Sequence, residues 1–195
     1  SDSGIGQTLN ISDCLVYGVP NLNHPLVTIY NHQEGYFTNN KFFGNQAKPA
    51  TVPLVVCDGL STTMFLNNSF ACTTVEGLVI KSENYPKRMN ANKIMGNLFE
   101  MCGDIVLSFS GYENIDIESE YNYISGNNSL YKKGTIKLEN CSNTHVFDSL
   151  SVVNGSGARR TLTINPYGSG AKDPYSHTEI TADQGGLVGT FIGEF

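Results

Sequence analysis

Short runs of alternating apolar and polar residues recur along the chain at a nearly constant interval. Two sets of mostly apolar positions, two residues apart, open each run: Leu26, Leu54, Leu78, Ile105 and Ile136, and then Thr28, Val56, Ile80, Leu107 and Leu138. The interval between copies is roughly 24 to 31 residues. Residues two apart on a strand share a face, so the pattern predicts strands that direct both sets into a common interior.

The alternate positions are predicted to point outward. They include Lys81, Lys137 and Glu139, which would be costly to bury without partners. The first outward set is Val27, Val55, Val79 and Val106. Four exposed valines in a column form an apolar patch of the kind that monomers avoid. We expect this column to contact either a neighbouring subunit or loops of the same chain.

A six-residue phrase with asparagine at its fourth position also recurs. Its predicted copies are residues 37–42, 65–70 and 89–94, which place Asn40, Asn68 and Asn92 at one bend. Asparagine tolerates left-handed backbone angles, and stacked asparagine side chains can hydrogen-bond along a ladder. A structural role at the bend is favoured over sugar binding.

A repeat of this length with no helical stretch does not fit a βαβ crossover and predicts a solenoid, whose turns bury a core only by stacking. We predict an all-β fold: a right-handed parallel β-helix of about five to six rungs over residues 1–153, followed by a small C-terminal β-cap over residues 154–195. The hand follows the crossover rule. The cap is predicted because a Gly-Ser-Gly turn at 155–157 precedes strands that lack the interval.

Composition narrows the range of partners. The 195 residues carry a net charge of −6 and no Lys/Arg run longer than a pair, which argues against a nucleic-acid partner. No apolar run approaches the length of a membrane span, so membrane insertion is not expected. The 5 cysteines are odd in number and widely spaced. They are predicted to be free, mostly buried thiols of a protein made in a reducing compartment.

An asparagine-rich, tryptophan-free β-coil with variable corner loops, an unprotected start and a small β-cap resembles the bacteriophage tailspike and tail-fibre proteins. The resemblance rests on architecture over roughly residues 25–195 and not on a signature motif. It implies a homotrimer in the virion tail, made in the bacterial cytoplasm, that binds and cleaves host surface polysaccharide. The chain has no head domain and fewer rungs than a full spike, so it is expected to be a C-terminal fragment.

Glycoside hydrolysis needs two carboxylates about 5 to 9.5 Å apart, which neighbouring rungs can supply. The predicted corner loops carry Glu34, Asp58, Glu83, Glu113 and Asp116. The predicted catalytic pair is Asp58 with Glu83, on successive rungs near the same corner. The predicted substrate-binding residues are Tyr85, Lys87, Arg88 and Glu113, the first three holding an anionic sugar by stacking and charge. The competing interpretation is that these acidic residues are simply solvated.

No metal or cofactor is expected. The four histidines are too scattered for a zinc site, and no aspartate cluster is present to hold the Ca²⁺ that a polysaccharide lyase would use. Two other functions stay open: a non-catalytic, receptor-binding and trimer-stabilising tip, and a secreted bacterial β-helix enzyme or adhesin. Release of reducing ends from purified host polysaccharide distinguishes a cleaving spike from a binding tip.

Overall fold

The computed structural model describes residues 6–84, 89–111, 121–131, 134–141, 144–148, 150–154, 162–165 and 179–182. Every regular element in these ranges is a strand: β1 (Gly6–Ser12), β2 (Leu15–Tyr17), β3 (Val27–Thr38), β4 (Lys41–Phe43), β5 (Val55–Ser61), β6 (Met64–Leu66), β7 (Ser69–Ala71), β8 (Leu78–Lys81), β9 (Lys93–Met95), β10 (Leu98–Glu100), β11 (Ile105–Ser110), β12 (Tyr123–Ser125), β13 (Asn128–Leu130), β14 (Thr135–Glu139), β15 (His145–Phe147), β16 (Ser151–Asn154), β17 (Leu162–Asn165) and β18 (Glu179–Ala182). The described part of the chain thus has no helix that could cross a membrane.

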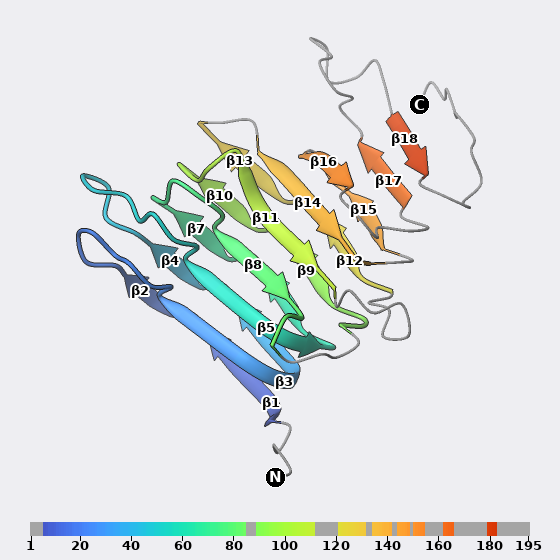
Figure 1. The fold of residues 1–195 in the computed structure, drawn as a ribbon, viewed down its shortest axis with the longest axis horizontal. Coiled ribbons are helices and arrows are strands. Elements are labelled where there is room, and N and C mark those ends of the chain that lie inside the picture. The colour runs from blue at the N-terminus through green and yellow to red at the C-terminus, as the bar shows by residue number, and fades with distance from the viewer. Residues whose placement is uncertain are drawn as a thin grey trace.

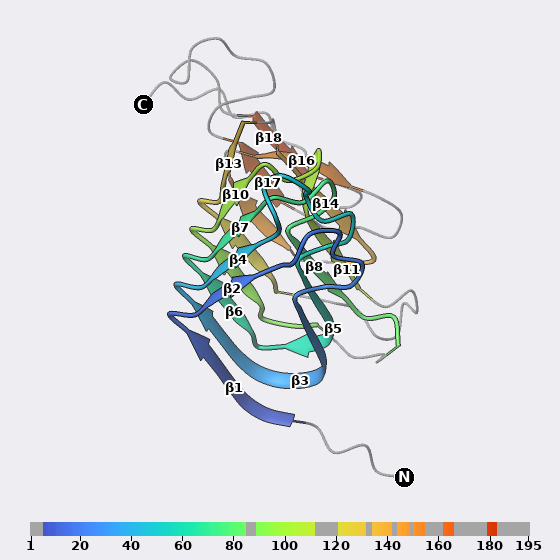
Figure 2. The same cartoon turned by 90° about the vertical axis from the view of Figure 1, so that its left-hand side faces the viewer.

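The strands form a coil with three parallel faces, so that each turn lies on the one before it. Face A consists of the first half of β3 followed by β5, β8, β11, β14 and β16. Face B consists of β1, the second half of β3, β6, β9, β12, β15 and β17, and face C of β2, β4, β7, β10 and β13. Figure 1 shows the turns following one another from the blue to the orange end of the chain, and Figure 2 shows the face C strands stacked in chain order. The prediction of an all-β fold of stacked parallel strands is confirmed.

Four turns carry a strand on all three faces within the described residues. Strands β1 and β2 add a partial turn before them, while β14 with β15 and β16 with β17 add partial turns after them. These partial turns account for the larger number of rungs predicted from the sequence. Strand β17 extends face B past residue 154, and β18 pairs with it in the antiparallel direction. The right hand of the coil and the domain boundary at residue 154 stay predictions.

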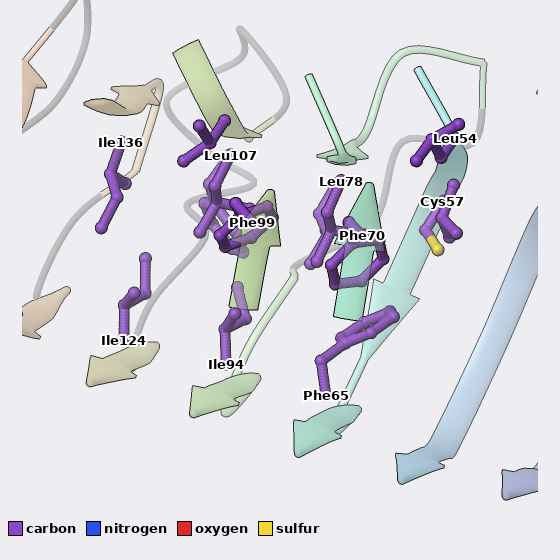
Figure 3. Packing of buried hydrophobic residues seen from close by; sticks show 14 of the residues in the cluster. Leu54, Cys57, Phe65, Phe70, Leu78, Ile94, Phe99, Leu107, Ile124 and Ile136 are labelled. Atoms are coloured by element: carbon purple, nitrogen blue, oxygen red, sulfur yellow. The ribbon is translucent and has the colours of Figure 1, made fainter. Parts of the chain in front are cut away.

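The interior is filled by columns of apolar side chains, one residue from each turn. On face B, Phe37 lies over Phe65 with ring centroids 4.5 Å apart. On face C, Phe42, Phe70 and Phe99 stack at 5.4 and 5.2 Å. All five rings are fully buried, and side chains from the three faces meet in the centre (Figure 3). Each such ring contributes about 1.5 to 3 kcal/mol by leaving water, so the stacked columns are the main source of stability.

A ladder of buried asparagines runs along the bend between faces B and C. Its members are Asn40, Asn68, Asn97 and Asn127, and it ends at the carboxylate of Asp148. The residue before each asparagine, which is Asn39, Asn67, Gly96 or Gly126, has a positive φ of 54 to 66°. Asparagine and glycine adopt this left-handed backbone at the lowest cost, which explains why they occur in pairs at this corner.

The predicted third copy of the asparagine phrase is wrong. Asn92 belongs to a second ladder at the bend between faces A and B, where its Oδ1 accepts a hydrogen bond from Thr63 N. Its own Nδ2 donates to Oδ1 of Asn122 at 3.1 Å. The true third copy is residues 94–99, because Ile94 pairs with Phe65 and Phe99 with Phe70.

The predicted register on face A is also corrected. Leu78 pairs with Val55 and Leu107, and not with Leu54 and Ile105. A slip of one residue exchanges the two faces of a strand, so Val55 points inward. Val55 and Val106 are fully buried, as is Leu54. The predicted outward column of four valines is therefore wrong.

The outward column of face A runs instead through Thr28, Val56, Val79, Ser108 and Lys137. Lys81, Lys137 and Glu139 point outward as predicted, with between about 30% and 35% of each side chain exposed. Only Thr62 and Thr63 separate β5 from β6, whereas residues 82–92 separate β8 from β9. The long segment after β8 agrees with the predicted corner loops, whereas Glu34, also predicted to be in such a loop, lies within β3.

Candidate functional site

A groove of about 420 Å³ lies on the outer surface of face A, over β8, β11 and β14. Its floor consists of two outward columns, Val79–Ser108–Lys137 and Lys81–Ser110–Glu139. These side chains face outward because the residues between them, Ile80, Phe109 and Leu138, are buried. We call this feature the face A groove. Glu76, Ser82, Glu83, Gly111 and Asn140 also line it.

Polar contacts fix most of the side chains in the face A groove. Ser108 Oγ donates a hydrogen bond to Glu76 Oε1 at 2.9 Å, which ties the segment before β8 to β11. Lys137 Nζ pairs with Glu139 Oε1 at 3.0 Å, and Lys81 pairs with Glu83. Ion pairs that water can reach add little to stability. The alignment of these two pairs along the floor is therefore not explained by a contribution to folding.

The Lys81–Ser110–Glu139 column of the groove presents a different polar group on each turn. Adjacent strands are about 4.8 Å apart, so Lys81 and Glu139, which lie two strands apart in one column, are separated by about 10 Å along the stack. Between them Ser110 supplies a hydroxyl. The floor therefore presents ammonium, hydroxyl and carboxylate groups in sequence. Such a set can donate to and accept from the hydroxyls of an extended polar ligand.

Asp58 lies in β5 and not in a corner loop, and it is fully buried. Its carboxylate accepts hydrogen bonds from the backbone N–H groups of Glu83 and Asn84, at 2.9 and 3.1 Å. The side chain of Asn84 donates a third bond, at 2.7 Å. Asp58 thus holds residues 83–84 against the coil. Asp58 therefore fixes the position of the segment that carries Glu83 into the groove.

Glu83 is the member of the predicted pair that reaches the groove. Its side chain is 66% exposed and forms the ion pair with Lys81. The structure brings Asp58 and Glu83 together through the Glu83 backbone, and their joint catalytic role stays a prediction. Tyr85, Lys87, Arg88 and Glu113, the predicted substrate-binding residues, lie outside the described residues.

Several groove residues were missed as candidates although the sequence contained a signal for them. The sequence predicts that Lys81, Lys137 and Glu139 point outward, and the repeat interval places Lys81 two turns before the other two. Ser108 and Glu76 were not singled out, because their contact joins two turns. No group of three or more His, Cys, Asp or Glu side chains in the described ranges is placed to hold a metal ion.

Comparisons with protein-family models, with curated proteins and with solved structures find no match to this chain.

Proposed function

We propose that this chain recognises a hydroxyl-rich polysaccharide along the face A groove, as part of a phage tailspike or tail fibre directed at the host surface. The observation that supports this most is the succession of an ammonium, a hydroxyl and a carboxylate group, from Lys81, Ser110 and Glu139, over three successive turns. A polysaccharide repeats its hydroxyls along its length, and each column of the coil presents one outward side chain about every 4.8 Å. Several weak contacts can then add together along one polysaccharide molecule.

The charge of the described groove favours a neutral ligand. Its lining contains two lysines and three glutamates, which are Lys81, Lys137, Glu76, Glu83 and Glu139. The whole chain carries a net charge of −6, so a polyanion would be repelled at long range. The sequence-based prediction of an anionic sugar rests on Tyr85, Lys87 and Arg88. Neutral and acidic polysaccharides are therefore separate arms of the test.

The proposal is tested by binding measurements on purified bacterial capsular, O-antigen and exopolysaccharide preparations, with neutral and acidic members in each set. Lys137→Ala removes an ammonium group from the groove floor, and Lys41→Ala removes an exposed lysine from face C as a matched control. We expect Lys137→Ala to weaken binding about tenfold, the value of a charge-assisted hydrogen bond, and Lys41→Ala to leave it unchanged. Equal effects of the two variants, or no binding to any preparation, would contradict the proposal.

Hydrolysis of the bound polysaccharide is the finer part of the proposal. The described groove offers the carboxylates of Glu76, Glu83 and Glu139, and glycosidases need a pair of such groups. Reducing-end release by the unmodified chain and by Glu76→Gln, Glu83→Gln and Glu139→Gln identifies the pair. If a polysaccharide binds but none of its bonds is cleaved, the chain is the non-catalytic tip.

Assembly as a homotrimer in the virion tail is also a proposal. The valine column no longer supports it, but the outward side of face B carries Met64, Leu66, Met95, Tyr123 and Phe147. This apolar surface is the proposed contact between subunits. Sedimentation equilibrium should give the mass of three chains, and a stable monomer at high concentration would contradict the trimer.

A further inference from the structure

The corner between faces B and C has the same length in each of the four turns that carry all three faces. Residues 39–40, 67–68, 96–97 and 126–127 form it, and every one of them is asparagine or glycine. These bends lie one over another along the coil (Figure 2). By contrast, residues 44–54 separate β4 from β5, and residues 82–92 separate β8 from β9. A second coil can therefore approach closely at the corner between faces B and C.

The strands on the two sides of this corner present their outward side chains at equal distances from it. On β9 and β10 the middle residue of each strand is buried, so the residues on either side of it point outward. Met95 and Leu98 directly flank the corner, while Lys93 and Glu100 lie two residues farther out. The other three turns have the same arrangement, with the outer positions always seven residues apart in sequence.

The symmetry of a trimer makes this spacing important. A cyclic trimer brings one surface of each subunit against a different surface of the next. If the corner between faces B and C lies on the three-fold axis, face B of each subunit meets face C of the next at the same level. Side chains at equal distances from the corner then lie opposite one another.

The side chains that become opposed in this way are complementary in chemistry. Two pairs join large apolar groups, one joins a long side chain to a short one, and one joins opposite charges. In chain order these outer pairs are Tyr36 with Phe43, Met64 with Ala71, Lys93 with Glu100, and Tyr123 with Leu130. No pair brings two like charges together, as a mismatched interface would.

The charged pair identifies face C as the partner of face B. Lys93 is exposed among the apolar side chains of face B, and Glu100 is half-buried on face C. Neither side chain forms an ion pair with another residue in the described ranges. An apolar contact that covered Lys93 without a carboxylate opposite would be costly. Face C supplies that carboxylate at the matching position.

We propose that three copies of this chain assemble with the corner between faces B and C on the three-fold axis, so that face B of each copy packs on face C of the next. Lys93 of each copy then pairs with Glu100 of the partner subunit. This inference rests on the trimer proposed above and adds the second surface and the ion pair. It leaves face A, with its groove, on the outer side of all three copies.

Charge reversal tests the assigned contact, with sedimentation equilibrium of the intact chain over a range of concentrations as the measurement. Lys93→Glu places two carboxylates opposite each other at all three contacts. We expect a loss of about tenfold at each contact, so the trimer dissociation constant should rise about a thousandfold. Glu100→Lys should have a similar effect. The double variant, Lys93→Glu with Glu100→Lys, should restore most of the lost affinity.

Two controls carry changes that should leave the trimer intact. Lys48→Glu makes the same charge change at an exposed position between β4 and β5, away from the flat of either face. Lys41→Ala acts on face C at the position opposite Thr38, where no carboxylate is present to pair with it.

The outcomes separate this inference from the trimer itself. If the unmodified chain is a trimer but neither reversal weakens it, or the double variant does not recover, the assigned contact is wrong and the trimer stands. A monomer in the unmodified chain contradicts the trimer and this inference with it. If Glu100→Lys does not fold, Lys93→Glu and Lys48→Glu decide, since equal dissociation constants in those two variants contradict the assigned contact.

Discussion

Asn68 donates a hydrogen bond from its side-chain Nδ2 to Oδ1 of Asn97, 3.0 Å away on the next turn. The same Oδ1 accepts the backbone N–H of Asn68 at 2.9 Å, and Asn68 Nδ2 also donates to the carbonyl oxygen of Phe37. One buried amide therefore satisfies polar groups on the turns before and after it. The coil can turn this corner without leaving backbone groups unpaired in a dry interior.

Asn97→Ala should destabilise the coil strongly. The change removes the acceptor for Asn68 N and Nδ2 and the donor to Phe65 O and to Asn127 Oδ1. Several buried polar groups lose partners at once, so we expect the free energy of unfolding to fall by about 3 kcal/mol. Urea denaturation followed by far-ultraviolet circular dichroism measures this loss. Asn23→Ala, at an exposed position, is the control and should change stability by less than about 0.5 kcal/mol.

Asp58→Asn and Glu83→Gln should have different effects on stability. Asp58→Asn places an amide group opposite the N–H groups of residues 83 and 84, so it should cost about 2 kcal/mol. Glu83→Gln weakens only an exposed ion pair and should cost less than about 0.5 kcal/mol. Parallel urea titrations of the two variants measure both values. Equal stability of both variants, with loss of polysaccharide cleavage in each, would favour the predicted catalytic pair instead.

The five thiols should differ sharply in reactivity. All are free, and Cys14 is exposed while Cys57, Cys72, Cys102 and Cys141 are buried. The thiolate is the reactive form, and burial raises the pKa of Cys57 and Cys141 as well as blocking access. A chromogenic disulfide reagent at neutral pH should modify only Cys14 in the native protein. The other thiols should react on unfolding in urea, whereas rapid native modification of a second thiol would contradict the described packing.

Stability should fall at alkaline pH because of the buried thiols. Burial raises the pKa of Cys141 to about 11 from a usual value of 9.0, so the folded state retains a proton that the unfolded chain has lost. The contribution of Cys141 to the free energy of unfolding is therefore fully present below about pH 9 and is lost as the pH rises toward 11. Between those limits the loss should be on the order of 2 kcal/mol.

The comparison of the unmodified chain with Cys141→Ala isolates this effect from other groups that titrate at high pH. We expect the difference in unfolding free energy between the two proteins to shrink as the pH is raised from 8.5 to 10.5 or so. A difference that stays constant over this range would show that Cys141 does not carry the pH dependence.

The sequence was sufficient to predict a stacked parallel coil, because the apolar intervals and the phenylalanine pairs Phe37–Phe65 and Phe42–Phe70 repeat clearly. It misplaced the third copy of the asparagine phrase because residues 89–94 and 94–99 both satisfy the pattern of apolar and asparagine positions. The true copy has Gly96 in place of an asparagine at the left-handed position. Glycine adopts this backbone more readily than Ala91 of the predicted copy, so Gly96 was the signal that distinguishes the two.

The register on face A could not be predicted for a related reason. Val55 and Leu54 are both apolar and both buried, so the alternation does not say which of them lies opposite Leu78. The register of parallel strands is set by the whole packed interior, and a single-residue slip reverses the face. The groove was only partly foreseen, since the contact of Ser108 with Glu76 depends on which turns are neighbours.

Disulfide trapping of one strand pair tests the stacking of the turns most directly. In the structure Leu66 on β6 pairs with Met95 on β9, and both side chains point outward. Paired strands bring Cα atoms to about 4.8 Å, within the range that a disulfide spans. In a Cys14→Ser background, Leu66→Cys with Met95→Cys should therefore form a disulfide, detected by intact mass. Leu66→Cys with Asn90→Cys, the pair expected from the alignment of residues 89–94 with 65–70, should not, and the opposite result would contradict the described coil.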